Sequence, residues 1–289
     1  MYDVSIIGSG PAGVSAAIYS SRAGLQTMII SENRGALAKA EKIENYYGFA
    51  KPISGENLLA DGILQAERVG TKLINDQVLN ISYEDGFLLK AKKNEYKAKS
   101  VVIATGSNRT APKIKGFRSY EGKGVSYCAV CDAFFYKGKD VAVLGCCEYA
   151  LHEAMELLPI VKSVTLITNG AAPIPAIPDD IRVITQEIVA FEGIDYLEGV
   201  RFYDGTVLSA AGVFVAIGVA GSSDLARKLG AETEGLKIIV DENMATNIPG
   251  LYAAGDCTGG MMQIAKAVYE GAKAGAEVVK YIRKNKINT

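Results

Sequence analysis

The sequence predicts an α/β fold made of two domains, and two observations support this prediction. At 289 residues the chain is long enough to bury two hydrophobic cores. A pattern of apolar strand, glycine turn and helix begins at Val4, and a second copy of the pattern begins at Val141. This pattern is typical of the first unit of a nucleotide-binding α/β domain. We therefore expect two such domains, one for each copy.

The first copy of the pattern is complete. An apolar strand at Val4–Ile7 leads into the turn Gly8-Ser9-Gly10-Pro11-Ala12-Gly13, and a helix is predicted from Val14 to Ala23. The first glycine allows the tight turn, the second lets the backbone approach a pyrophosphate, and the third permits the helix to pack closely on the strand. The phosphates of a dinucleotide would then lie at the N-terminus of the helix.

A second strand and an acidic residue follow this unit. Thr27–Ile30 is a short apolar run that predicts a buried strand, and Glu32 lies just beyond it. A carboxylate about 20 residues beyond the glycine turn holds a ribose hydroxyl in domains of this kind. Glu32 is therefore a candidate ligand of the ribose.

The second copy of the pattern is damaged. Its strand, Val141–Gly145, is followed by Cys146 and Cys147, and a helix is predicted from Leu151 to Leu158. Cys147 stands where a pyrophosphate needs glycine, and the next strand, Val164–Thr168, is followed by neither an acid nor an arginine. We expect the skeleton of a nucleotide domain without its binding chemistry. The two cysteines would fill the vacated site; a second redox pair is the alternative, although adjacent cysteines rarely form an unstrained disulfide.

The C-terminal part of the chain predicts one more strand and a long helix. Ile248–Asp256 indicates a turn, a short strand and a Gly255-Asp256 corner, and Cys257 beside it is expected to be a small core residue. A helix is predicted over Gln263–Ile282, whose small and apolar residues suit packing against a sheet.

Cys128-Ala129-Val130-Cys131 is the segment that carries redox chemistry. Two cysteines separated by two residues can form a disulfide that takes up two electrons and passes them on by thiol exchange. A zinc half-site and two inert buried thiols are the alternatives. Zinc needs four ligands, and the one histidine, His152, is far away in sequence and expected on a helix surface, so we expect no metal. Asp132 follows directly and is placed to move a proton, with a plain helix cap as the alternative.

Composition limits the partners and the compartment. The chain has 31 basic and 32 acidic residues, so no global field favours nucleic acid or an anionic membrane. Met1-Tyr2-Asp3 leads into the first strand without a basic leader, and no apolar run approaches the roughly 20 residues of a membrane span. Five unevenly spaced cysteines favour a reducing compartment. We expect a cytoplasmic protein without nucleic-acid or membrane partners.

Five segments at a characteristic spacing occur in order along the chain. They are Gly8–Gly13, Ile43–Phe49, Ala104–Gly106, Cys128–Asp132 with Phe134-Phe135, and Ala254–Asp256. Together they resemble low-molecular-weight thioredoxin reductases of the flavin disulfide reductase superfamily, over nearly the whole chain. The resemblance implies FAD as cofactor, thioredoxin as substrate and a homodimer. It also implies two Rossmann-like domains of the FAD/NAD(P)-binding type: an FAD domain formed by residues 1–109 and 219–289, and a smaller dithiol-bearing domain inserted at residues 110–218.

The resemblance also implies roles for single residues. Cys131 would face the flavin, Cys128 would attack the disulfide of thioredoxin, and Asp132 would give and take the proton. The start of the last helix would face the flavin ring, with ordinary core packing as the alternative. The residues expected to hold FAD, from the glycine motif and the resemblance together, are Gly8, Ser9, Gly10, Pro11, Ala12, Gly13, Glu32, Asn45, Ala104, Thr105, Gly106, Gly255, Asp256, Met262, Gln263 and Ile264.

The chain departs from the NADPH-dependent members of that family at one ligand site. Those enzymes have a complete second glycine motif, an arginine-rich segment after the next strand, and a Gly-x-x-Pro-Asn hinge. This chain has Cys147, Thr168-Asn169-Gly170 and Gly218–Ser222 in these places. The pattern resembles the ferredoxin-dependent flavin thioredoxin reductases of clostridia. We expect a thioredoxin reductase with ferredoxin as donor; the alternatives are NAD(P)H bound in an altered site, and a flavin and dithiol redox sensor without turnover.

Overall fold

The computed structural model describes residues 1–32, 35–106, 112–127, 129–173, 177–217 and 221–287. The chain divides into two compact units: unit 1 consists of residues 1–108 and 221–289, and unit 2 of residues 109–220. The domain boundaries expected at 109/110 and 218/219 fall outside the described residues.

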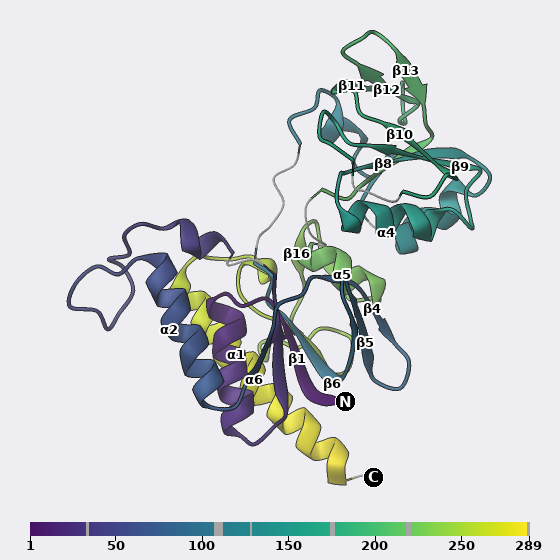
Figure 1. Ribbon diagram of the computed structural model, residues 1–289. Helices are drawn as coiled ribbons and strands as arrows, with labels where there is room; N and C mark the ends of the chain where they lie inside the picture. Colours follow the sequence, from purple (N-terminus) through teal and green to yellow (C-terminus); the bar gives the residue numbers. More distant parts are fainter. Residues whose placement is uncertain (33–34, 107–111, 128, 174–176, 218–220, 288–289) are drawn as a thin grey trace. The chain divides into compact units, whose positions relative to one another are not determined.

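Unit 1 is built on a seven-stranded sheet in the order β3-β2-β1-β6-β5-β4, with β17 paired to β6 (Figure 1). Strands β3, β2, β1, β6 and β17 are joined by parallel pairings, whereas β4, β5 and β6 form an antiparallel meander. The strands are β1 (Tyr2–Ile7), β2 (Thr27–Ile30), β3 (Lys72–Ile74), β4 (Val78–Tyr83), β5 (Phe87–Ala91), β6 (Glu95–Ile103) and β17 (Leu251–Ala253).

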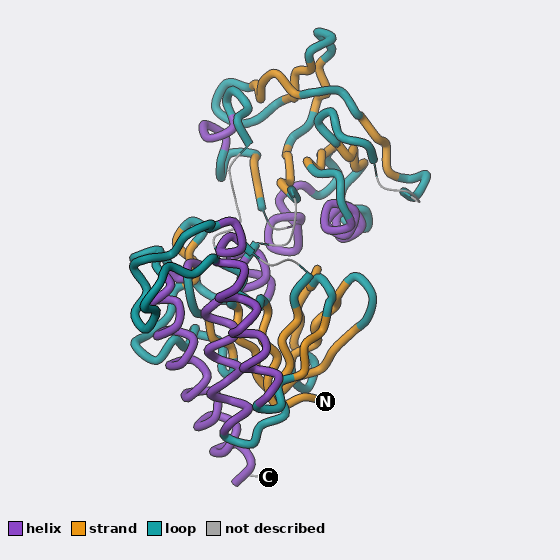
Figure 2. The backbone as a smooth tube through the Cα atoms, turned by 60° about the vertical axis from the view of Figure 1, so that its left-hand side comes forward, coloured by secondary structure: helices purple, strands orange, loops and turns teal. Residues whose placement is uncertain are grey.

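Three long helices lie together on one side of this sheet: α1 (Pro11–Arg22), α2 (Gly55–Arg68) and α6 (Ile264–Ile287) (Figures 1 and 2). Glycines let α1 and α6 approach backbone to backbone. A Cβ atom at Gly271 would lie 2.1 Å from the Ala12 carbonyl oxygen, and one at Gly275 would lie 2.5 Å from the Ala16 carbonyl oxygen. Apolar side chains form most of the core between helices and sheet, and Val4 and Val102 among them are inaccessible to solvent.

Shorter elements complete unit 1. They are the 3₁₀ helices η1 (Ala36–Lys39) and η4 (Asp256–Thr258), the helix α5 (Ser222–Lys228), and the hairpin strands β15 (Thr233–Glu234) and β16 (Lys237–Ile238). η4 lies directly after β17 and therefore at the carboxyl edge of the parallel sheet.

Unit 2 pairs a five-stranded parallel sheet, in the order β10-β9-β8-β14-β7, with the antiparallel sheet β11-β12-β13. Its strands are β7 (Val125–Ser126), β8 (Asp140–Leu144), β9 (Ser163–Ile167), β10 (Ile181–Ile184), β11 (Ile188–Glu192), β12 (Gly199–Phe202), β13 (Val207–Ser209) and β14 (Gly212–Val215). Its helices are η2 (Phe117–Tyr120), α3 (Ala129–Asp132), η3 (Ala133–Tyr136) and α4 (Glu148–Leu157). A single core of buried side chains, including Phe191 and Val213, joins the two sheets.

The structure confirms the α/β fold and most of the predicted elements. β2 matches the predicted strand at both ends, and α1 begins at Pro11, because proline suits the first helical position. The expectation for His152 is wrong: it is 9% exposed, because the buried face of α4 includes it together with Tyr149 and Glu153. Cys257 is 2% exposed, which confirms it as a core residue.

The described residues offer no candidate for a membrane span or for a metal site. No helix there combines the length and the apolar character that crossing a membrane requires. Within the same residues, His, Cys, Asp and Glu side chains do not gather into a group of three or more that could hold a metal ion.

Candidate functional site

The segments expected to hold FAD meet at one edge of the unit 1 sheet. The glycine turn follows β1, Glu32 follows β2, Ala104–Gly106 follows β6 and Gly255-Asp256 follows β17. These four strands run parallel and lie next to one another, so their carboxyl ends share an edge. Open α/β sheets bind their ligands outside this edge.

The three glycines of the turn differ in what surrounds them. Gly8 has φ +109°, and a Cβ atom there would lie 2.4 Å from the Ala104 carbonyl oxygen. A Cβ atom at Gly13 would lie 1.9 Å from the Gly8 carbonyl oxygen, so this glycine permits α1 to pack on the strand end. At Gly10 a Cβ atom would meet nothing within 4 Å. The protein itself therefore leaves open the position where a pyrophosphate would approach.

The N-terminus of α1 is free to bind an anion. Its cap residue, Gly10, provides no side-chain hydrogen bond, and Pro11 occupies the first helical position. The first turn of α1 contains no acidic residue, so its partial positive charge is not neutralised locally. Ser9 Oγ donates a hydrogen bond to Ser31 Oγ at 3.0 Å, which ties the turn to the end of β2. Glu32 comes next and is exposed.

The strand end after β6 is fixed by a residue from outside the predicted set. Ser222, at the start of α5, donates to the Gly106 carbonyl oxygen at 2.9 Å, and its Oγ lies 2.5 Å from Thr105 Oγ1. Since the Ser222 proton goes to Gly106, the Thr105 hydroxyl is the donor in the second bond. Ala104 is buried and lies against Gly8.

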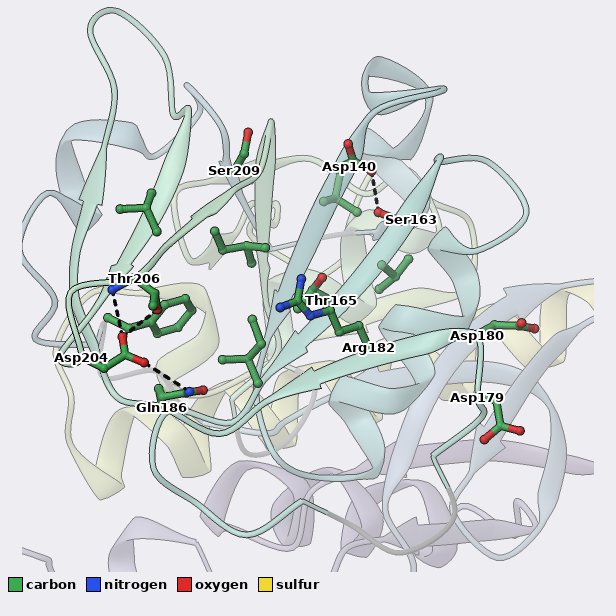
Figure 3. A pocket seen from close by; sticks show the side chains of 16 residues that line it. Asp140, Ser163, Thr165, Asp179, Asp180, Arg182, Gln186, Asp204, Thr206 and Ser209 are labelled. Carbon is green, nitrogen blue, oxygen red and sulfur yellow. Dashed lines mark hydrogen bonds between the residues drawn. The ribbon is translucent and has the colours of Figure 1, made fainter.

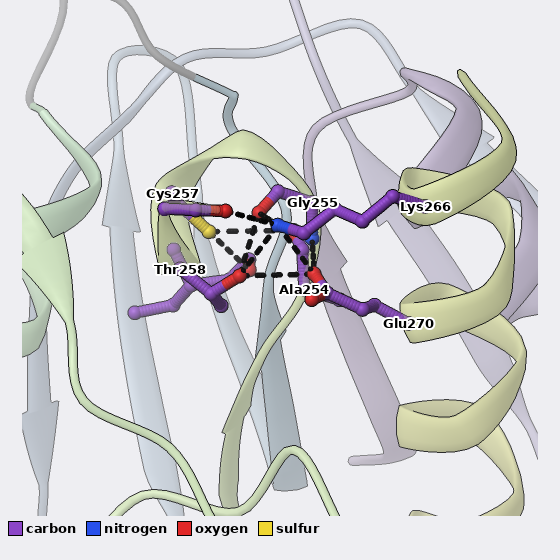
Figure 4. Close-up of polar contacts among 8 residues, drawn as sticks. Ala254, Gly255, Cys257, Thr258, Lys266 and Glu270 are labelled. Carbon is purple, nitrogen blue, oxygen red and sulfur yellow. Dashed lines mark hydrogen bonds and ion pairs between the residues drawn. The ribbon is translucent and has the colours of Figure 1, made fainter. Parts of the chain in front are cut away.

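The Gly255-Asp256 corner is held by two charged residues of α6 (Figure 4). Lys266 Nζ donates to the carbonyl oxygens of Gly255 and Gly259, and Glu270 accepts from the Gly255 N–H at 2.8 Å. Lys266 and Glu270 form an ion pair of 3.0 Å. Gly255 has φ +89°, a conformation that favours glycine.

Two of the residues expected beside the flavin ring are joined directly. Asn45 Nδ2 donates to Gln263 Oε1 at 2.9 Å, although 218 positions separate them in the sequence. Met262 next to Gln263 is 62% exposed, and Ile264 begins α6. The structure thus brings Asn45, the methionine and the start of α6 to one surface of unit 1, where an apolar ring would be covered on contact.

The dithiol segment lies in unit 2. Cys128 is outside the described residues; the Cys131 backbone belongs to α3, and its side chain is outside what is described. Asp132 accepts a hydrogen bond from Ser126 Oγ at 2.6 Å and makes no capping bond to η3. Partial burial, together with the Asp132 charge, raises the pKa of Tyr136.

A buried carboxylate holds the start of α3. Glu153 of α4 is 2% exposed, and its Oε2 accepts the Ala129 N–H at 3.0 Å. The Ala129 amide is the one that directly follows Cys128 in the chain. Glu153 therefore fixes the backbone at the entrance to the dithiol segment.

The second glycine turn retains only its structural glycine. A Cβ atom at Gly145 would lie 2.2 Å from the Ala216 carbonyl oxygen, so the turn packs against the end of β14. Cys147 is the cap residue of α4, and its Sγ lies 3.8 Å from the same oxygen. Burial, and then the neighbouring Cys147, raises the pKa of Cys146. Asn169, after β9, accepts the Ile188 N–H at 2.7 Å and so has a structural role.

Unit 2 also contains a groove of about 840 Å³ that the sequence did not predict (Figure 3). Its lining includes four aspartates, Asp140, Asp179, Asp180 and Asp204, and the cation Arg182. Asp140 and Asp204 hydrogen-bond to neighbouring hydroxyls. The groove lies at the amino ends of β8 and β9, whereas a nucleotide would bind at their carboxyl ends. It is therefore separate from the vacated nucleotide position.

Four residues that position these segments were missed by sequence reasoning: Ser222, Glu153, Lys266 and Glu270. Lys266 and Glu270 are spaced four residues apart on the predicted helix, which was a usable signal for an ion pair. That spacing alone does not distinguish a buried pair from an exposed one.

Comparison with known proteins identifies the family of this chain. The profile of the family described as "Pyridine nucleotide-disulphide oxidoreductase" matches residues 2–271. The chain is 34% identical over 302 aligned positions to a thioredoxin reductase of Aquifex aeolicus, with 98% of this chain and 94% of the relative covered.

Two solved structures show the same fold over the whole chain. The atypical thioredoxin reductase TRi from Desulfovibrio vulgaris Hildenborough has a TM-score of 0.91 and 41% identity, covering 98% of this chain and 99% of that one. A ferredoxin-flavin thioredoxin reductase from Clostridium acetobutylicum has a TM-score of 0.70 and 33% identity, covering 98% of both chains.

FAD is the cofactor of thioredoxin reductases in this family, and unit 1 fits it. The open position at Gly10 leaves room for a pyrophosphate, and the free N-terminus of α1 is electrostatically suited to one. The exposed Met262 offers apolar surface for a flavin ring. On the family profile, the relatives and this fit, the chain belongs to the pyridine nucleotide-disulphide oxidoreductase family and is a homologue of its thioredoxin reductases.

Proposed function

We propose that this chain is a thioredoxin reductase that receives electrons from reduced ferredoxin and passes them, through FAD and the Cys128/Cys131 dithiol, to the disulfide of thioredoxin. The observation that carries the choice of donor is the second glycine turn. Cys147 occupies the cap position of α4, where the pyrophosphate of a nicotinamide nucleotide needs glycine. Asn169, where a ribose or phosphate ligand belongs, bonds to Ile188 instead.

One structural neighbour supports the same donor by its name. The protein from Clostridium acetobutylicum is called a ferredoxin-flavin thioredoxin reductase, and it is similar to this chain over 98% of its length. Several other relatives are named only as thioredoxin reductases, so they support the substrate and not the donor.

The energetics allow this route. A ferredoxin at about −400 mV lies roughly 130 mV below a dithiol at about −270 mV, and this difference corresponds to about 6 kcal/mol for two electrons. FAD accepts electrons singly and delivers them in pairs, which is the chemistry the cofactor supplies here when it is bound.

The residues of unit 1 bind and orient the cofactor in this proposal. The turn from Gly8 to Gly13, with Ser9, Gly10, Pro11 and Ala12, holds the pyrophosphate on α1, and Glu32 holds a ribose hydroxyl. Gly255 and Asp256 contact the part of FAD that links the flavin ring to the phosphates. Asn45, Met262, Gln263 and Ile264 lie against the ring, and Ala104, Thr105 and Gly106 close the strand edge beside it.

The residues of unit 2 carry out the thiol exchange. The Cys128 thiolate attacks one sulfur of the thioredoxin disulfide and releases the other as a thiolate. Cys131 then attacks Cys128 in the mixed disulfide, which frees reduced thioredoxin and leaves a Cys128–Cys131 disulfide. Two protons finish on the thioredoxin thiols, and Asp132, oriented by Ser126, transfers one of them. The dithiol must face the flavin and then thioredoxin, so the proposal requires the dithiol-bearing domain, residues 110–218, to move relative to residues 1–109 and 219–289.

The proposal also includes a cytoplasmic homodimer. Five unevenly spaced cysteines with a working dithiol suit a reducing compartment.

An anaerobic comparison of donors tests the proposal. Oxidised protein is mixed with reduced ferredoxin, NADPH or NADH, flavin bleaching is followed, and thiols formed on thioredoxin are counted. We expect bleaching and thiol formation with ferredoxin only. Rapid bleaching by micromolar NADPH or NADH would contradict ferredoxin as the donor and assign the nicotinamide nucleotide instead. Flavin bleaching without the formation of thiols on thioredoxin would indicate a redox sensor instead of a reductase.

A further inference from the structure

The ion pair between Lys266 and Glu270 lies inside unit 1 and not on its surface. The two side chains are only 13% and 12% exposed and are separated by 3.0 Å. In another pair on the same helix, Lys280 with Glu277, the lysine is 73% exposed and the glutamate 15%. Exposed pairs contribute little, whereas a charge held away from water must be compensated by well-placed partners. The surroundings of Lys266 and Glu270 show which partners these are.

Both side chains bond to the same turn (Figure 4). Lys266 Nζ lies 2.8 Å from the Gly255 carbonyl oxygen, 2.9 Å from Thr258 Oγ1 and 2.5 Å from the Gly259 carbonyl oxygen. Glu270 Oε2 accepts from the Gly255 N–H and from Thr258 Oγ1, at 2.8 and 2.9 Å. One lysine and one glutamate thus bond to four polar groups of this turn: the Gly255 N–H, the Gly255 and Gly259 carbonyl oxygens and the Thr258 hydroxyl.

This turn cannot hold its shape by backbone preference alone. Gly255 and Gly259 have φ +89° and +81°, and glycine has the greatest conformational freedom in the unfolded chain. Gly255 also packs on the glycine turn, because a Cβ atom there would lie 2.9 Å from Ala12 Cβ. Together with the internal hydrogen bonds of η4, the ion pair therefore helps to fix where Asp256 lies relative to the turn that begins α1.

We propose that Lys266 and Glu270 are positioning residues for FAD, which hold the Gly255-Asp256 corner in its binding geometry and whose balanced charges set the midpoint potential of the bound flavin. The proposal rests on the FAD site proposed above. Lys266 places a positive charge in the first turn of α6, beside the segment proposed to contact the ring, and Glu270 compensates it. Removing one charge leaves the other unbalanced at the same place.

Three variants of the FAD-loaded protein test this. Lys266→Met and Glu270→Gln each remove charge-assisted hydrogen bonds, so the dissociation constant for FAD should rise about tenfold or more. Lys280→Met is the matched control, because it removes an exposed lysine of the same helix that is also paired with a glutamate, and it should leave FAD affinity unchanged. Affinity is measured from the flavin fluorescence released on dilution.

The midpoint potential of the bound flavin gives a readout that a purely structural role of Lys266 and Glu270 would not change in this way. Lys266→Met leaves Glu270 uncompensated and should lower the flavin midpoint potential, whereas Glu270→Gln leaves Lys266 uncompensated and should raise it. Lys266→Arg keeps the charge and should restore most of the affinity. If Lys266→Met does not accumulate as folded protein, Thr258→Val removes the bridging hydroxyl without leaving a charge unpaired and should still weaken FAD binding.

The proposal is overturned if Glu270→Gln or a folded Lys266→Met binds FAD as tightly as the parent, or if their potentials move in the same direction. Reduction by dithionite with viologen indicator dyes needs neither ferredoxin nor thioredoxin. If the assignment of ferredoxin or thioredoxin failed, the test of Lys266 and Glu270 would still be valid. If the proposal for Lys266 and Glu270 failed, the assignment of donor and substrate would not be affected.

Discussion

Replacing Gly10 and Gly13 one at a time by alanine separates the binding of FAD from the packing of α1. At Gly10 the backbone has φ −73° and ψ −178°, which alanine adopts without strain, and a Cβ atom meets nothing within 4 Å. The cofactor-free variant should be as stable as the parent or up to about 1 kcal/mol more stable, because alanine lowers the entropy of the unfolded chain. FAD should bind about 10 to 100 times more weakly, since the methyl group stands where a phosphate contacts the backbone, and such a contact contributes about 1.5–3 kcal/mol.

Gly13→Ala should instead lower the stability of the cofactor-free protein. Its Cβ atom would lie 1.9 Å from the Gly8 carbonyl oxygen, which is about 1.5 Å short of an ordinary contact at 3.4 Å. The obstacle is backbone, so α1 must move away from β1, and overpacking of this kind costs about 1–3 kcal/mol or more. Urea denaturation of the cofactor-free proteins measures the free energy of unfolding, and fluorescence titration measures FAD affinity. A Gly10→Ala protein with parental affinity for FAD would refute the placement of the pyrophosphate at this turn.

Three further predictions concern two carboxylates of unit 2 and the cysteines Cys146 and Cys257, which lie in unit 2 and unit 1 respectively. Asp132→Asn should slow the formation of thioredoxin thiols by about 10²–10⁴-fold in a single-turnover assay, because a proton carrier is lost. FAD binding should not weaken. An unchanged rate would show that Asp132 takes no part in the mechanism. Glu153→Leu should lower the free energy of unfolding by about 1–3 kcal/mol, because the buried Ala129 N–H loses its acceptor. Glu156→Leu on the same helix removes a longer contact of 3.7 Å with His152 and should lower the free energy of unfolding by about 0.5 kcal/mol or less. Equal effects would contradict the role of Glu153. Burial raises the pKa of Cys257 to about 12 and also raises the pKa of Cys146. In a Cys128→Ser/Cys131→Ser protein, the thiols of Cys146 and Cys257 should therefore be mostly protonated at pH 7–8. Iodoacetamide should therefore label Cys146 slowly, and faster as the pH rises, while native Cys257 stays unlabelled; mass spectrometry showing rapid labelling of Cys257 at pH 7 would contradict its burial.

The sequence was sufficient for features that depend on local pattern. The turn from Gly8 to Gly13 could be placed because strand, glycines and helix are consecutive. The strand Thr27–Ile30 could be placed because three consecutive apolar residues follow Thr27 and end at the polar Ser31. The resemblance added Asn45 and Gln263, which no local pattern links and which the structure joins by a hydrogen bond.

Features that depend on the meeting of distant segments were not predictable. Glu153 was not recognised because its partner, the Ala129 N–H, is a backbone group with no sequence signature. Lys266 and Glu270 have the spacing of an ordinary surface pair, and only the path of Gly255–Gly259 against α6 buries them. The expectation for His152 failed because short helices with several apolar faces do not reveal which face is covered.

Counting the electrons that the oxidised protein accepts tests the central claim, that the Cys128/Cys131 pair takes electrons from FAD and passes them to thioredoxin. In an anaerobic titration with dithionite, the parent should take up four electrons per chain, two on FAD and two on the disulfide, and then yield two thiols on added thioredoxin. Cys131→Ser should take up two electrons and yield none. A parent protein that accepts only two electrons, or a Cys131→Ser protein that still reduces thioredoxin, would contradict the account.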